Sequence, residues 1–202
     1  MRRKTLDMLA VAGGAVLTIV LIAAGSLGLW GYNYAQSNVH NQLAMQHIVF
    51  PTKAEFAQAK PGTEITPGMI PYLEKYAGQP LLTGAQAEAY ADHFIAVHLS
   101  EMPYGGVYAL VSAASRADPT NAKLAALVQT SFMGTTLRGL LLEAYAFSTF
   151  GTIALVGAIV SFILAGIMLI LTLLGLWHYF RTGKDEEFPK SLHHEERVSA
   201  GV

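Results

Sequence analysis

The side chains best suited to chemistry gather in one stretch, between residues 88 and 101. Glu88 and Asp92 are four residues apart, so on a helix both carboxylates share one face, where an oxygen-loving cation could meet them. His93 and His98 are five residues apart, about 140° around a regular helix, and therefore cannot bind one ion together. A metal site in this stretch needs a further ligand from another part of the chain.

Two histidines ahead of this stretch are the available partners. His40 and His47 are seven residues apart, on one helix face but about 10 Å from each other, so at most one can join a given site. The full candidate set for a divalent metal is Glu88, Asp92, His93, His98, His40 and His47. The alternative is a set of solvated carboxylates and locally hydrogen-bonded histidines, and no cofactor is predicted.

Catalytic motifs are missing from the sequence. The chain has no cysteine, which removes thiol chemistry, thiolate metal ligands and disulfides. It also lacks the HExxH, GxSxG and glycine-rich phosphate-binding patterns, and Ser100 is close to His98 in sequence only. No catalytic residue is predicted.

Two long apolar runs determine the architecture that must position these residues. Neither the run from Leu9 to Trp30 nor the run from Ile153 to Trp177 contains a charged residue, and each exceeds the roughly 20 residues that a membrane-spanning helix needs. The sequence therefore predicts an integral membrane protein. The predicted parts are an N-terminus (1–8), a first span (9–30), a helical middle segment (31–143), an interfacial and second spanning segment (144–180) and a disordered tail (181–202).

Basic residues predict the orientation in the membrane. Arg2, Arg3 and Lys4 precede the first span, and Arg181 and Lys184 follow the second. Basic residues near the ends of a span favour the cytoplasmic side, so both termini are expected in the cytoplasm of a two-span cell-membrane protein and the middle outside it. The alternative for the first run is a secretory signal, with a cleavage site among the small residues 23–26.

Helical signals continue from both spans into the middle segment. The first helix is expected to reach about Ile48, followed by an irregular, proline-rich connection (51–80) with one short helix near residues 70–76. A capping box at Thr83 and Gln86 predicts a helix to about Glu101. A further short helix is expected at 107–116.

The second spanning helix is expected to begin well before the membrane. Asp118 and Pro119 resemble an N-cap followed by proline at the first helical position, and no proline interrupts 120–180. The predicted fold is an all-α membrane protein whose two spans extend into an extracytoplasmic helical bundle. Arg138 and Glu143, near the outer end of the second span, are interpreted as interfacial residues.

Small residues recur at helical spacing within the spans. They are Gly157, Ser161 and Ala165 in the second span and Ala10 and Gly14 in the first. Such residues let helix backbones approach closely in lipid. They either pack the two spans on each other or dock them to other membrane proteins or to a second copy.

The segments Gly84–His98 and Thr136–Phe147 resemble a group of uncharacterised actinobacterial membrane proteins of about two hundred residues. Some proteins of that group are labelled aromatic ring-opening dioxygenases, and no catalytic residue carries over from them. The resemblance implies an actinobacterial cell envelope and two spans. The function expected is that of an accessory or scaffold subunit of an envelope membrane assembly, in contact with lipid and other membrane proteins and not with nucleic acid. The alternatives are an external metal- or ligand-binding protein and an enzyme acting on lipid or cell-wall precursors.

Overall fold

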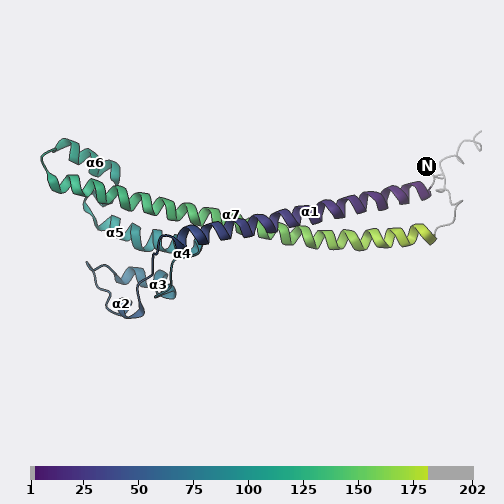
Figure 1. Ribbon diagram of the computed structural model, residues 1–202, viewed down its shortest axis with the longest axis horizontal. Coiled ribbons are helices and arrows are strands. Elements are labelled where there is room, and N and C mark those ends of the chain that lie inside the picture. Colours follow the sequence, from purple (N-terminus) through teal and green to yellow (C-terminus); the bar gives the residue numbers. More distant parts are fainter. Residues whose placement is uncertain (1–2, 182–202) are drawn as a thin grey trace, which may run out of the picture. The chain divides into compact units, whose positions relative to one another are not determined.

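The computed structural model describes residues 3–181, and all regular structure in that range is helical (Figure 1). Two helices are long and apolar enough to cross a membrane, α1 (Arg3–Ala44) and α7 (Ala122–Arg181). The expectation of an all-helical protein with two long apolar helices is confirmed. The predicted disorder of the tail falls almost entirely on 182–202, outside the described residues.

The chain divides into two compact units, each described by itself. The first, here called the span unit, comprises residues up to Gly28 and from Val156 onward. The second, here called the helical unit, comprises Leu29–Leu155. Both α1 and α7 contribute residues to both units.

Small residues form the contact between α1 and α7 in the span unit. Gly14 lies so close to Thr172 that an added Cβ would stand 2.5 Å from its Oγ1, and a Cβ on Gly25 would stand 2.9 Å from the Phe162 ring. The Thr18 hydroxyl, itself buried, donates to the Gly14 carbonyl at 2.8 Å. Such close backbone approach is how helices associate where burial of apolar surface gives no driving force.

Large apolar side chains of the span unit point outward. Only 11% of the most apolar window of each long helix is buried, whereas the core helix of a water-soluble protein is mostly buried. Examples more than half exposed are Val16, Ile19, Leu27, Ile163, Ile170 and Leu173.

The helical unit has the opposite arrangement, with its large apolar side chains inside. Its core draws on α1, on the proline-rich connection, on the helical segment after residue 83 and on α7; its most deeply buried members are Phe50, Phe56, Met69, Leu73, Leu81 and Leu141. Three of these six, Phe56, Met69 and Leu73, come from the proline-rich connection, which therefore supplies core side chains as well as joining two helices.

Short helices shape the connection. α2 (Lys53–Ala57) begins with a capping box in which Thr52 accepts from the Glu55 amide and Glu55 reaches back to the Thr52 amide. The predicted helix near 70–76 is present as α3 (Ile70–Leu73) between two 3₁₀ turns, η1 (Pro67–Met69) and η2 (Glu74–Tyr76). Within 51–80, irregular backbone and turns occupy 51–52, 58–66 and 77–80.

The helix predicted after Thr83 is confirmed, but it is not regular. α4 (Gly84–Tyr90) starts at the predicted capping box, and α5 (Ala96–Glu101) ends it. Between them Ala91–Ile95 forms a π-helical turn, η3. Because a π turn holds more residues than an α turn, it rotates the residues beyond it relative to the regular helix assumed from the sequence.

A hairpin of two helices follows the 3₁₀ turn η4 (Pro103–Gly106). α6 (Tyr108–Ala117) agrees with the prediction of a helix at 107–116. α7 begins at Ala122 because the Asn121 side chain accepts from the Leu124 amide. The predicted N-cap at Asp118 is wrong, since that carboxylate instead accepts from Thr120 and Asn121 in the turn.

Within the helical unit, α1 and α7 run antiparallel and are joined by a polar pair. The Gln36 amide donates to the Ser148 carbonyl, and the Ser148 hydroxyl donates to the Gln36 side chain, both at 3.0 Å. Gly84, at the start of α4, lies directly against Ser148, so a side chain there would collide with α7. The pair therefore also fixes where α4 meets α7.

Candidate functional site

The π turn positions two of the predicted site residues, and each has a partner within the fold. The Arg138 guanidinium donates to Asp92 Oδ1 at 2.7 Å, which links α7 to η3. The His93 ring stacks on Tyr72, with ring centroids 3.5 Å apart and planes 6° from parallel. Arg138, interpreted from sequence as interfacial, is thus a tertiary contact of Asp92.

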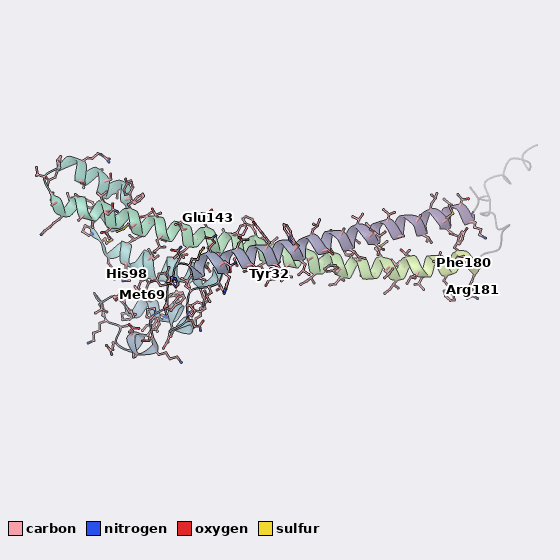
Figure 2. The ribbon with its side chains drawn as sticks, in the orientation of Figure 1. Tyr32, Met69, His98, Glu143, Phe180 and Arg181 are labelled. Carbon is pink, nitrogen blue, oxygen red and sulfur yellow. The ribbon has the colours of Figure 1, made fainter. Side chains whose placement is uncertain are left out.

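The remaining predicted ligands lie apart from this pair. His98, on α5, has Nδ1 2.7 Å from the Phe94 carbonyl and its ring 4.5 Å from the Phe94 ring (Figure 2). Glu88 is half-buried, and His40 and His47 are exposed. Within residues 3–181, no three histidine, aspartate or glutamate side chains gather where they could hold one metal ion.

Two titratable groups of the helical unit are perturbed for different reasons. Burial raises the pKa of Tyr90, and the negative charge of Glu64 raises it further. Tyr90 packs against the rings of Phe94 and Phe50, at 4.6 and 5.5 Å. Hydrogen bonds from the Thr52 backbone and side chain lower the pKa of Glu55, so the perturbation there comes from a helix cap.

A groove between α1 and α7 has a volume of about 460 Å³. This α1–α7 groove lies wholly in the helical unit, within residues 34–46 and 137–147. Its floor is buried and apolar, formed by Val39, Leu43 and Leu141. Its rim carries Tyr34, Leu140 and Phe147, which are 54%, 58% and 42% exposed.

Polar side chains stand on both walls of the groove. Asn38 and Gln42 are four residues apart on α1 and therefore share one face, and Gln46 lies in the turn just after the helix ends. Glu143 on α7 is the only lining residue among those described that is charged at neutral pH (Figure 2). The groove thus combines an apolar floor with a few hydrogen-bonding groups, as ligand pockets generally do.

The hairpin of α6 and the start of α7 carries a second unusual surface. Six of its large side chains are 42–53% exposed, namely Tyr104, Val107, Tyr108, Leu110, Phe132 and Met133. Tyr108 and Phe132 touch across the hairpin, with ring centroids 5.6 Å apart. Ser131, fully buried, donates to the Gly106 carbonyl at 2.5 Å and ties the two arms together.

The predicted helix-packing residues differ in burial: some are buried and others are exposed. Gly14 and Ala165 are buried in the span unit, and Ser161 is half-buried. Ala10 is exposed but lines a small cavity with Gly14 and Thr172. Gly157 is exposed with nothing within 4 Å of an added Cβ, so its face of α7 is open to lipid or another helix.

The sequence provided no direct signal for the groove or the apolar hairpin surface. Leu137, Leu140 and Leu141 form one apolar stripe in sequence, yet Leu141 is buried and Leu140 is exposed. Which part of such a stripe stays open depends on the elements packed against it. A visible signal existed for the cap of α2, because Thr52 and Glu55 have capping-box spacing.

Comparison with protein-family models, with curated proteins and with solved structures gives no match to this chain.

Proposed function

We propose that this protein is a non-enzymatic subunit of a cell-envelope membrane assembly, in which it acts as a scaffold. Its span unit crosses the cell membrane, both termini are cytoplasmic and the helical unit lies outside the cytoplasm. The outward apolar side chains of α1 and α7 support the membrane placement, since such a surface needs lipid or protein around it. Basic residues before the first span and after the second support the orientation.

The observation that carries the scaffold function is the exposed apolar surface of the hairpin. Its six large side chains lie in a part of the chain outside both apolar runs, so lipid does not cover them in this placement. Aromatic residues and methionine, of which Phe132 and Met133 are examples, are enriched where proteins dock on one another. The hairpin is therefore assigned as the docking surface.

Charge around the hairpin favours a different protein over a second copy. Arg116 and Lys123 are both exposed at its end, and Asp118 is the acidic residue between them. These three residues leave a net positive charge at the end of the hairpin, so a partner with acidic residues there is favoured over a second copy with the same charge. The partner is accordingly a membrane protein whose external segment is apolar at the centre of the contact and acidic at its rim.

Photocrosslinking in the native membrane tests this assignment. A benzoylphenylalanine at Phe132 should give one discrete adduct whose mass exceeds the chain by that of a different protein. The same group at Thr130, exposed on the opposite side of the same helix, is the matched control and should give little or none.

A second substitution tests whether the adduct reports a docking surface. Tyr108→Ala in the Phe132-crosslinker background should reduce the yield about tenfold or more, because aromatic anchors commonly contribute 2 kcal/mol or more to an interface. Equal adducts at Phe132 and Thr130, adducts of twice the chain mass alone, or a clean monomer in mild detergent would each contradict the proposal.

A further inference from the structure

The α1–α7 groove has the dimensions of a site for a single lipid chain. The lining residues of α1, from Tyr34 to Leu43, extend over about 14 Å at 1.5 Å per residue. One leaflet of a bilayer holds hydrocarbon about 15 Å thick, half of roughly 30 Å. The volume of about 460 Å³ also lies in the range of ligand pockets.

One end of the groove lies at the aromatic residues that mark the membrane surface in the proposed placement. Tyr34, on its rim, stacks on Trp30 with ring centroids 5.5 Å apart, and Trp30 ends the first apolar run. Phe147, on the other wall, lies one turn before Phe150, which is 68% exposed. Because aromatic side chains favour the headgroup level, a lipid can enter the groove at this end without crossing open water.

The polar groups of the groove identify the headgroup. The contact of Gln36 with Ser148 sets the antiparallel register, which brings Gln42 level with the α7 turn that carries Glu143. The Glu143 carboxylate attracts an ammonium group and repels a headgroup with net negative charge. The amide groups of Gln42 and Gln46 can donate to phosphate oxygens beside it.

We propose that the α1–α7 groove binds one aminophospholipid from the outer leaflet. Glu143 accepts from the lipid ammonium, the glutamine amides donate to its phosphate, and one acyl chain lies on Val39, Leu43 and Leu141. This inference rests on the proposed membrane placement and not on the docking role of the hairpin. Binding of a lipid there covers apolar rim residues that the chain itself leaves exposed.

The test uses the full chain in nanodiscs that contain phosphatidylethanolamine or phosphatidylglycerol with a photoactivatable acyl chain. Phosphatidylethanolamine should label residues 137–147, and phosphatidylglycerol should label them much less. Labelling of the exposed span residue Ile163 by both lipids is the internal control for membrane placement. Its failure would contradict the placement and the inference together.

Three variants separate the groove from other surfaces. Glu143→Gln, which preserves shape, should reduce the preference for phosphatidylethanolamine by about tenfold, equivalent to about 1.4 kcal/mol. Phe147→Asp should remove groove labelling, whereas Phe132→Asp, also on an exposed phenylalanine of α7, should retain it and lose the hairpin adduct. The melting temperature of each variant checks that it is folded.

Two outcomes would overturn the inference. The first is equal labelling by both lipids that Glu143→Gln does not change. The second is protection of the groove by a second copy, seen as a crosslink between chains at Phe147. Either result is compatible with a hairpin that still docks a partner protein, so the two proposals fail independently.

Discussion

The span unit and the helical unit place their large apolar side chains in opposite ways. In the span unit the residues at the helix contact are small, with Gly14 and Gly25 against the other helix and side chains such as Ile163 outside. In the helical unit large side chains such as Met69 and Leu73 are 0% exposed. The difference indicates two solvents: lipid around the span unit in the proposed placement, and water around the helical unit.

Two places in the helical unit depart from its own pattern. The α1–α7 groove and the hairpin each gather several exposed large apolar side chains, in a unit whose core encloses others such as Met69 and Leu73. A surface of this kind in water usually marks an interaction site. These two surfaces, and not the scattered histidines and carboxylates, are therefore the candidate interaction sites of the helical unit.

Truncating the core should have the largest effect on stability. Leu73→Ala removes a fully buried side chain and should destabilise the helical unit by about 2–5 kcal/mol, through lost burial and the cavity left behind. The matched control is Leu173→Ala in the span unit, which is 55% exposed and should change the melting temperature little. Similar losses for both variants would break the comparison.

An added charge should affect the span unit more than the helical unit, when membrane insertion is measured. Ile163→Arg places a cation on an exposed position inside the second apolar run and should cost about 2.5–3.5 kcal/mol of insertion free energy. Val49→Arg, also on an exposed residue but in the helical unit, should insert like the wild type. The fraction of each chain in carbonate-washed membranes measures this, and equal insertion of both would be evidence against two solvents.

A glycine at the base of the hairpin offers a sharper test of local geometry. Gly106 has φ +63° and faces the Leu99 carbonyl, so Gly106→Ala adds both strain and a collision, and should cost more than about 1–3 kcal/mol. Gly105→Ala, with φ +61° and open space around it, shares only the strain. The melting temperature of Gly106→Ala should be well below that of Gly105→Ala. Equal melting temperatures would show that the backbone at Leu99 moves aside at little cost.

Features of this fold that depend on residues close together in the chain were predictable from the sequence. The apolar runs, the capping box at Thr83 and the helix after Pro103 depend on residues close together in the chain, and all are present. The start of α7 was predicted three residues early because Asp118 and Asn121 both can cap a helix, and the structure uses Asn121.

Features that join distant residues were not predictable. Asp92 and Arg138 are 46 residues apart, and neither has a neighbour in sequence that indicates the other. The core role of the proline-rich connection was missed because Phe56, Met69 and Leu73 have no helical or strand periodicity. The π turn was missed because the stretch that contains it also fits a regular helix.

Removal of the two capping boxes should lower stability by different, smaller amounts. Thr83→Ala removes a cap whose partner Gln86 is buried, and should cost about 1–2 kcal/mol. Thr52→Ala removes the exposed cap of the five-residue α2 and should cost less. The melting temperatures of the two variants measure the ranking, and a larger loss for Thr52→Ala would indicate that α2 holds the connection in place.

The smallest expected effect is a pH dependence from Tyr90. Because its pKa is raised in the folded state, its contribution to stability is complete below the unfolded value of about 10 and is lost as pH rises through the folded value. The difference in melting temperature between wild type and Tyr90→Phe should therefore change above about pH 10 and stay constant below it. A constant difference up to pH 11.5 would mean that Tyr90 is readily ionised in the fold.

Single-cysteine labelling tests the two-solvent account most directly, because the chain has no cysteine of its own. A membrane-impermeant maleimide applied to intact cells should label Glu74→Cys in the helical unit, should label Thr5→Cys only after the membrane is permeabilised, and should not label Ile163→Cys in either case. All three side chains are exposed in the structure, so burial within the protein does not explain a difference among them. Equal labelling of the three in intact or permeabilised cells would contradict the account.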